Sequence, residues 1–224
     1  IAESLRDAGY ATFFAGKWHL GNAGFMPTDQ GFTNDDGGET GPKFGAKTKP
    51  DGDPKKTDRI TDAAVKFIES HKDQPFFAYL PFNAPHVPIG ARADLVAKWE
   101  EKAKQAPADM WGKEGDNKLR MVQNNAQYAA MLEQLDEGIG RVLTALEKNG
   151  LTEKTIIIFM SDNGGLSTSE GTPTSNLPLR GGKGWPYEGG VREPMIVVAP
   201  GVTKPGTTCE TPVISTDFYP TLLQ

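Results

Sequence analysis

Lys17 and His19 stand two positions apart in the segment GKWHLG at 16–21, and together their side chains could bind an anion. Side chains two apart on an extended segment point to the same face. The glycines at both ends of the segment let a ligand or another backbone approach closely. We therefore expect an ammonium and an imidazole to be presented together at the end of a strand, as in a catalytic site for an anionic group.

His86 is a second candidate, because it follows the apolar run FFAYLP at 76–81 and lies between Pro85 and Pro88. The two prolines restrict the backbone and would hold the imidazole in one orientation. A turn histidine bonded to a carbonyl is an equally good interpretation from residue type alone. The third histidine, His71, falls at a predicted helix end, where solvation or the helix dipole explains it.

Asp162 and Asn163 could hold a metal ion, because they offer a carboxylate and an amide carbonyl directly after an apolar run. Hard oxygen donors suit Ca²⁺ or Mg²⁺. Ligand sites of open α/β sheets form at the carboxyl ends of strands. An Asx-turn that closes the strand is the alternative, and for an isolated Ser-Asp-Asn-Gly it is the commoner one. Asp35 and Asp36 also look like a metal pair, but a solvated loop explains them better.

Lys183 lies among three glycines in LRGGKG at 179–184, so its ammonium could meet an anion beside open backbone amides. A solvated loop lysine is the usual alternative. Trp185 and Tyr187 could form an apolar wall for a sugar ring or aryl group, or simply pack the loop down. Arg180 is explained equally well by an ion pair that supports the loop.

The elements that must position these residues alternate between helix and strand, which predicts an α/β fold. In order they are a helix ending near Ala8, a strand at 11–16, a helix at 60–71 capped by Asp58, a strand at 76–81, a helix at 118–148, and strands at 155–160 and 195–198. The run TIIIFM at 155–160 is typical of a central parallel strand covered on both faces. Segments 33–56 and 164–186 are expected to be long surface loops.

The long helix at 118–148 has apolar residues every three or four positions. A coiled-coil seam is the alternative interpretation. The apolar rhythm departs from a seven-residue repeat, and Gly138 and Gly140 would loosen a zipper. Packing against a sheet is therefore favoured. Near the end of the sequence, DFYPTLL at 217–223 predicts a capped helix start that packs under the sheet.

The bulk composition excludes some partners. The length of 224 residues favours one domain, and the formal net charge of −5 gives no general attraction for nucleic acid or an anionic membrane. No apolar run approaches the roughly 20 residues that span a bilayer. The sequence opens without Met inside a helical pattern, so we expect a fragment. The single cysteine, Cys209, excludes an internal disulfide, and the oligomeric state stays open.

Six segments, taken in order, resemble the motifs of the type I sulfatases of the alkaline-phosphatase-like superfamily. They are GKWHLG at 16–21, APHVP at 84–88, SDNGG at 161–165, LRGGKG at 179–184, EGGVREP at 188–194 and STDFYPTLL at 215–223. Each segment alone is a weak signal. Their shared order along nearly the whole chain makes chance an unconvincing explanation.

The resemblance implies a fold, an activity and a set of site residues. The fold would be a three-layer sandwich with a mostly parallel central sheet flanked by helices, and the activity would be hydrolysis of sulfate monoesters of aryl or carbohydrate type. The implied roles are catalysis by Lys17, His19 and His86, substrate binding by Lys183 with His86, and binding of one divalent ion, Ca²⁺ or else Mg²⁺, by Asp162 and Asn163. It also implies a periplasmic, extracellular or lysosome-like compartment.

Three family features are missing from the sequence. Type I sulfatases carry a formylglycine made from the first residue of a Cys/Ser-x-Pro-x-Arg motif, with two metal-binding aspartates further upstream. The segment CETPV at 209–213 has its proline one position late and no arginine after it, so Cys209 is not this nucleophile. We expect residues 1–224 to be a partial catalytic domain, without the nucleophile segment or the smaller C-terminal subdomain, and inactive alone.

Two other functions remain open from the sequence. A metal with a lysine and histidine anion site also serves phosphoryl groups, so a phosphonate or phosphodiester hydrolase of the same superfamily is one alternative. A sulfatase-like binding protein without catalysis is the other. The retained lysines and histidines argue against the second alternative.

Overall fold

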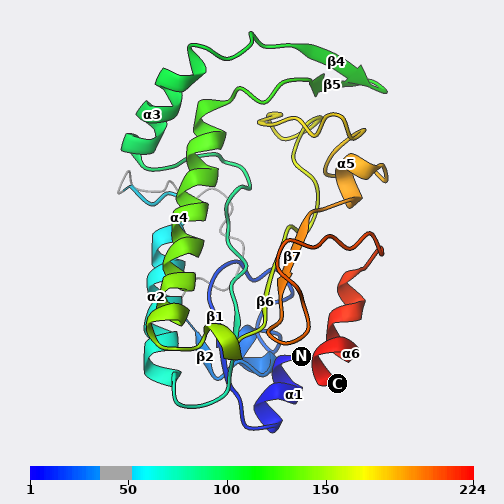
Figure 1. The fold of residues 1–224 in the computed structure, drawn as a ribbon. Helices are drawn as coiled ribbons and strands as arrows, with labels where there is room; N and C mark the ends of the chain where they lie inside the picture. The colour runs from blue at the N-terminus through cyan, green and yellow to red at the C-terminus, as the bar shows by residue number, and fades with distance from the viewer. Residues whose placement is uncertain (36–51) are drawn as a thin grey trace.

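The computed structural model describes residues 1–35 and 52–224 (Figure 1). In chain order the elements are α1 Ala2–Asp7, β1 Ala11–Phe14, β2 Asn34–Asp35, α2 Thr57–His71, β3 Phe76–Tyr79, α3 Ala93–Ala103, β4 Trp111–Glu114, β5 Asn117–Arg120, α4 Ala126–Lys148, β6 Ile157–Met160, α5 Glu188–Val191, β7 Met195–Val198 and α6 Phe218–Leu223. Three short 3-10 helices lie at Pro27–Gln30, Thr152–Lys154 and Ser215–Asp217.

β1 is the middle strand of a parallel three-stranded sheet in the order β2-β1-β3. Its side chains alternate between two apolar layers, as expected for a strand. On one face Phe13 stacks on Phe67 of α2 with ring centroids 4.5 Å apart. On the other face Phe14 contacts Trp18 and Phe32 beside α1. Helices therefore cover both faces of this sheet, which confirms the predicted α/β class.

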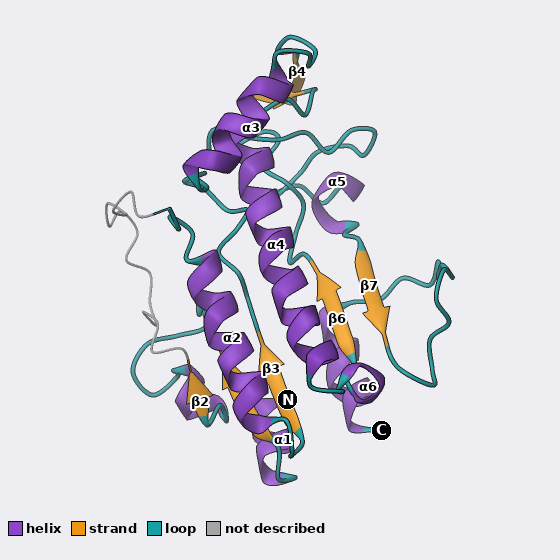
Figure 2. Cartoon of the chain, turned by 60° about the vertical axis from the view of Figure 1, so that its left-hand side comes forward, coloured by secondary structure: helices purple, strands orange, loops and turns teal. Residues whose placement is uncertain are grey.

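α4 packs lengthwise against α2 and, nearer its start, against α3 (Figure 2). Gln134 of α4 is fully buried and joins the starts of both partners. Its side chain accepts a hydrogen bond from the Arg92 backbone at 3.1 Å and donates one to Asp58 Oδ2 at 2.9 Å. The predicted packing against a sheet is therefore only partly right within the described residues: α4 packs mainly on the helices α2 and α3, and it reaches strand residues of the apolar clusters through Val142 and Leu146.

The boundaries of two helices differ from the predictions. α2 begins at Thr57 with Lys56 at the N-cap, so Asp58 is not the cap and instead bonds Gln134. The predicted helix at 118–148 is wrong in its first turn, because 117–120 form β5 of a hairpin with β4. α4 begins after Asn125, whose side-chain oxygen accepts from the Tyr128 backbone at 3.2 Å. The apolar residues at 119 and 122 have the spacing of a helix, but residue 119 lies in the hairpin and residue 122 lies between the hairpin and α4.

β6 is not a central parallel strand covered on both faces among the described residues. It pairs only with β7, and this pairing is antiparallel. Ile157 packs on the ends of α2 and α4, but Phe159 and Met160 are 43% and 40% exposed. The apolar run correctly predicts a strand. It does not identify the segment that would bury the side chains of that strand.

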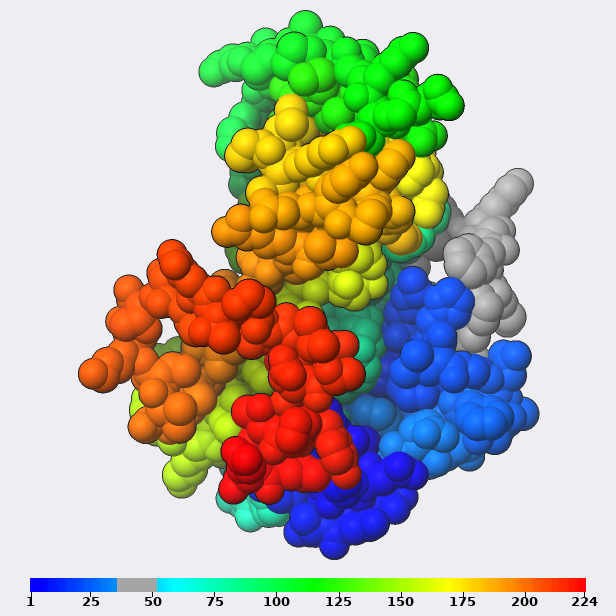
Figure 3. Space-filling view, turned by 90° about the vertical axis from the view of Figure 1, so that its right-hand side faces the viewer, coloured from blue at the N-terminus to red at the C-terminus, as the bar shows by residue number. Residues whose placement is uncertain are grey.

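The last helix, α6, lies on the surface beside α1 (Figure 3). Asp217 is the N-cap of α6 but makes no side-chain cap bond to it; its carboxylate instead accepts from the Ile214 backbone at 2.9 Å and closes the preceding 3-10 helix. Tyr219 lies 3.0 Å from Ser4 of α1, oxygen to oxygen. The prediction that this helix packs under the sheet is wrong, because most of its side chains are exposed.

The two predicted surface loops differ from expectation. In 33–56, Asp35 ends β2, and Asp36 lies outside the described residues, as does most of that segment. The segment 164–186 has no helix or strand, but it is not a surface loop. Many of its residues are buried, among them Gly164, Leu166, Ser167, Thr168, Pro173, Thr174, Ser175, Gly181 and Gly182. Among the residues described, no helix has both the length and the apolar character to cross a membrane.

Candidate active site

His86 and Lys183 meet although 97 positions separate them: Lys183 Nζ lies 2.9 Å from His86 Nε2. His86 follows β3, and its Nδ1 lies 2.7 Å from the Val87 carbonyl oxygen. A carbonyl only accepts, so Nδ1 carries the proton and Nε2 offers its lone pair to the ammonium. Both side chains are 29% exposed. Two of the predicted site residues therefore form one accessible pair.

Hydrogen bonds inside the segment 164–186 hold Lys183 in place. The Lys183 backbone donates to the Gly165 carbonyl at 3.2 Å. Asn176 donates to the Gly165 and Gly181 carbonyls at 2.8 and 3.0 Å and accepts from the Gly165 backbone at 3.1 Å. The buried Ser167 hydroxyl also donates to Gly181, at 2.9 Å. A loop with this many internal bonds can fix the lysine without a helix or strand.

Glycines make this packing possible, because the backbone segments 164–165, 181–182 and 189–190 contact one another directly. A Cβ placed on Gly164 would lie 1.8 Å from the Gly189 carbonyl oxygen. A Cβ on Gly182 would lie 2.4 Å from the Gly165 carbonyl oxygen. The close approach of these backbone segments thus requires the Gly-Gly pairs of the sequence. It also joins the end of β6 to the part of segment 164–186 that carries Lys183, which we call the Lys183 loop.

The far side of the Lys183 loop is clamped onto the β4–β5 hairpin, and Figure 3 shows the two segments packed together. Arg180 donates to Glu114 at 2.8 to 3.2 Å, and this hydrogen bonding lowers the pKa of the Glu114 carboxyl. The Arg180 guanidinium also lies 3.8 Å from the ring centre of Tyr187, which stacks on Trp185. These contacts confirm the ion-pair interpretation of Arg180 and favour loop packing for the two aromatic residues.

Lys17 follows β1 at the sheet edge where β3 also ends and where the segment that carries His86, the His86 loop, begins. Its backbone donates to the Pro81 carbonyl at 2.8 Å. The same carbonyl oxygen would lie 2.2 Å from a Cβ on Gly16, which has a φ of +133°. Only glycine fits there without a shift. Gly16 therefore lets the segments that carry Lys17 and His86 leave the sheet together.

Lys55 is a buried cation at this edge that sequence reasoning missed. It is 8% exposed, and its Nζ donates to the Pro88 carbonyl at 3.1 Å, which ties it to the His86 loop. Burial, and then the charge of Lys17, lower the pKa of Lys55 from 10.5 to about 8. Its only sequence signal is a place just before α2 in DPKKTD, which is typical of an exposed loop.

Lys55 predicts a pH dependence of stability. The unfolded chain holds the Lys55 proton up to pH 10.5, whereas the folded protein releases it near pH 8. The unfolded state binds more protons in that window, so the free energy of unfolding rises with pH there, by at most about 1.4 kcal/mol per pH unit. Urea unfolding from pH 7.5 to 10.5 should show wild type gaining stability relative to Lys55→Met. A constant difference between the two would contradict the shift.

His19 is exposed on the segment after the buried Trp18. The described contacts join His86 to Lys183 and place Lys17 near Lys55, and the participation of His19 in the same site stays a prediction. Cys209, the rejected nucleophile, is exposed on the segment that follows β7.

Asp162 and Asn163 lie directly after β6, as predicted. Asp162 is exposed, and its charge contributes, after burial, to raised pKa values of Tyr79 at the end of β3 and of Glu193. This excess of negative charge suits a cation. Within 1–35 and 52–224, however, no three His, Cys, Asp or Glu residues group closely enough to hold a metal. The pair thus fits a divalent ion as two oxygen ligands of a larger set.

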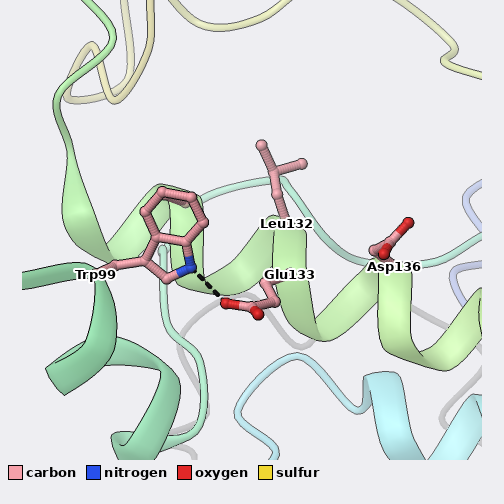
Figure 4. Close-up of a pocket in the computed structure, with 5 residues that line it drawn as sticks. Trp99, Leu132, Glu133 and Asp136 are labelled. Atoms are coloured by element: carbon pink, nitrogen blue, oxygen red, sulfur yellow. Dashed lines mark hydrogen bonds between the residues drawn. The ribbon is translucent and has the colours of Figure 1, made fainter. Parts of the chain in front are cut away.

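A separate shallow pocket of about 400 Å³ lies between α3 and α4 (Figure 4). Of its two lining carboxylates, Glu133 accepts from Trp99 Nε1 at 2.6 Å and pairs with Lys98. Hydrogen bonding to Lys98 lowers the pKa of Glu133. The carboxylate is thus already used to join the two helices, and the pocket shares no residue with the predicted site.

Comparison with known proteins identifies the family. The sulfatase family model matches residues 1–224. A sulfatase of Formosa agariphila is 44% identical over 75% of this chain and 29% of its own length. Mouse arylsulfatase J is 33% identical over the whole chain and 38% of its own length. The chain therefore spans about a third of these relatives.

The fold agrees with this assignment. The crystal structure of Ps i-CgsB in complex with k-i-k-neocarrahexaose matches with a TM-score of 0.76 and 29% identity, over 98% of this chain and 51% of that one. A sulfatase sequence match over the full chain, a matching fold and the meeting of His86 with Lys183 lead to one conclusion. The chain belongs to the sulfatase family.

Proposed function

We propose that the complete protein hydrolyses sulfate monoesters and that Lys183 and His86 hold the sulfate group. The contact of 2.9 Å between Lys183 Nζ and His86 Nε2 carries this proposal. An ammonium on a flexible stem can turn from the imidazole to a sulfate oxygen while it remains a donor. A proton on Nε2 would make His86 a second donor to the same group. Family membership and the sulfatase relatives support the choice of sulfate.

The residues of this chain would bind and orient the ester, because the sequence has no Cys/Ser-x-Pro-x-Arg motif. Lys17, with buried Lys55 near it, would add positive potential at the same sheet edge. By the family pattern His19 would act during release of sulfate. We propose accordingly that residues 1–224 are part of a catalytic domain, that the formylglycine lies outside them, and that the piece alone has no turnover.

Asp162 and Asn163 would supply a carboxylate and an amide oxygen to one divalent ion, Ca²⁺ or else Mg²⁺. Such an ion would neutralise charge on the sulfate oxygens. Two ligands are fewer than the six to eight that Ca²⁺ takes, so other oxygen donors must complete the set. Asp162 is exposed at the strand end and available for this.

Removal of Asp162 tests the metal proposal. Elemental analysis of the purified complete protein should find about one divalent ion per chain, and Asp162→Ala should lose most of it because a charged ligand is gone. Asp116→Ala is the matched control, since Asp116 is exposed in the β4–β5 turn. An Asp162→Ala protein that keeps its full ion content would remove this residue from the metal site.

Paired substrates test the activity itself. The complete protein should hydrolyse an aryl sulfate faster than the matching aryl phosphodiester or phosphonate. The reverse order would favour the phosphoryl alternative, and sulfate binding without turnover would favour a binding protein. A carbohydrate sulfate is a second substrate class to assay, because the solved relative Ps i-CgsB is in complex with k-i-k-neocarrahexaose.

A further inference from the structure

A carboxylate already lies against both members of the Lys183–His86 pair. Glu170 Oε1 is 3.6 Å from Lys183 Nζ, and Glu170 Oε2 is 3.7 Å from His86 Nε2. Its side chain is 45% exposed, so it can move without disturbing a core. The two oxygens of Glu170 therefore meet the same two nitrogens that the proposed function assigns to the sulfate group.

The backbone around Glu170 holds the carboxylate at this place. Glu170 and Thr172 have φ values of +51° and +47°, and Gly171 between them has +88°. Residues with a Cβ seldom adopt this left-handed region, and they do so where the surrounding structure imposes it. Here the Thr172 backbone donates to the Ser169 carbonyl at 2.9 Å and closes the turn. The turn brings Glu170 to face the Lys183–His86 pair.

We infer that Glu170 is an internal counter-anion of the Lys183–His86 pair, which it neutralises before a sulfate group binds and must leave when one does. This inference rests on the proposed function of that pair. The carboxylate competes with any anion for the Lys183 ammonium, and for His86 when its Nε2 is protonated, and it repels an anion that binds beside it. Glu170 is not assigned a part in breaking the ester bond. It acts on anion binding through Lys183 and His86.

The repulsion sets a charge preference. Coulomb energy scales with the product of the charges. A sulfate monoester carries one negative charge, and the inorganic sulfate released from it carries two. Glu170 therefore disfavours the product more than the substrate. It would speed product release at the expense of some substrate affinity, which is a useful exchange when the substrate concentration exceeds KM.

The test is Glu170→Gln in the complete protein, because glutamine keeps the shape and removes the charge. The inhibition constant of inorganic sulfate should fall about fivefold, the size expected for exposed ion pairs. KM for an aryl sulfate should fall only about twofold, because the ester carries half the charge. Glu153→Gln is the control, since Glu153 is exposed in the 3-10 helix before β6. It should change neither constant.

Three results would overturn the inference: an unchanged sulfate inhibition constant, a raised one, or equal changes in that constant and in KM. Equal changes would mean a general structural effect without charge preference. If the wild-type protein shows no ester hydrolysis, the proposed function fails by itself. Calorimetric titration of inorganic sulfate into wild type and Glu170→Gln then still decides the role of Glu170. Tighter binding by the variant supports that role, and equal or weaker binding rejects it.

Discussion

Replacing His86 with alanine in the complete protein should lower kcat/KM for an aryl sulfate by about a thousandfold. The imidazole is held by its bond to the Val87 carbonyl and presents Nε2 to the site at 2.9 Å from Lys183 Nζ. Alanine removes that nitrogen and leaves Lys183 without this hydrogen-bond partner. Positioned acid–base groups contribute about 10² to 10⁴ in rate, and lost orientation of the ester adds to this.

The control for His86 is His71→Gln. His71 Nδ1 lies 2.9 Å from the Phe67 carbonyl of its own helix, and its ring stacks on Phe67. Its replacement should leave kcat/KM within about twofold, as for a residue away from the site. Adding Lys183→Met to His86→Ala should cost less than the two single losses combined, because groups that act on one ligand are not additive. Unchanged turnover in His86→Ala would refute its role.

Gly164→Ala should have the largest effect on folding of the site. The new Cβ would lie 1.8 Å from the Gly189 carbonyl oxygen, so the segment after β6 and the start of α5 must move apart. Overpacking against backbone costs about 3 kcal/mol or more, since backbone cannot change rotamer. The same contacts hold the Lys183 loop in place, so activity should fall together with stability. Thermal unfolding and aryl sulfate turnover measure the two effects.

Gly140→Ala is the matched control for this substitution. Gly140 lies in α4, where an added Cβ meets nothing within 4 Å. Alanine is a better helix former than glycine by about 1 kcal/mol, so this variant should be as stable as wild type or more so. A Gly164→Ala protein with a wild-type unfolding midpoint would show that the close backbone approach does not exist in solution.

Much of the fold could be predicted because the strands are short apolar runs. β1, β3, β6 and β7 all lie within the predicted segments, and the Met195–Val198 strand has the predicted bounds. The class of fold follows from this alternation of elements. The ends of the helices were harder to predict. The start of α2 and the β4–β5 hairpin depend on local backbone hydrogen bonds, which residue types do not determine. The exposure of β6 was missed because apolar character does not identify a partner.

The site was predictable only in part. His86 and Lys183 stand in Gly/Pro-rich segments, and their types are consistent with an anion site, but a turn histidine and a solvated loop lysine explain them as well. Lys55 and Glu170 could not be found this way. Lys55 is a lysine in a polar stretch that happens to be buried, and Glu170 sits in a loop whose left-handed turn brings it to the pair. Both depend on contacts between segments far apart in sequence.

A crystal structure of the complete protein with bound sulfate tests the central claim most directly. The account predicts a sulfate whose oxygens lie within hydrogen-bond distance of Lys183 Nζ and His86 Nε2, with the Glu170 carboxylate displaced from both. A sulfate bound elsewhere, with Lys183 still donating to His86 and Glu170 still beside them, would contradict it.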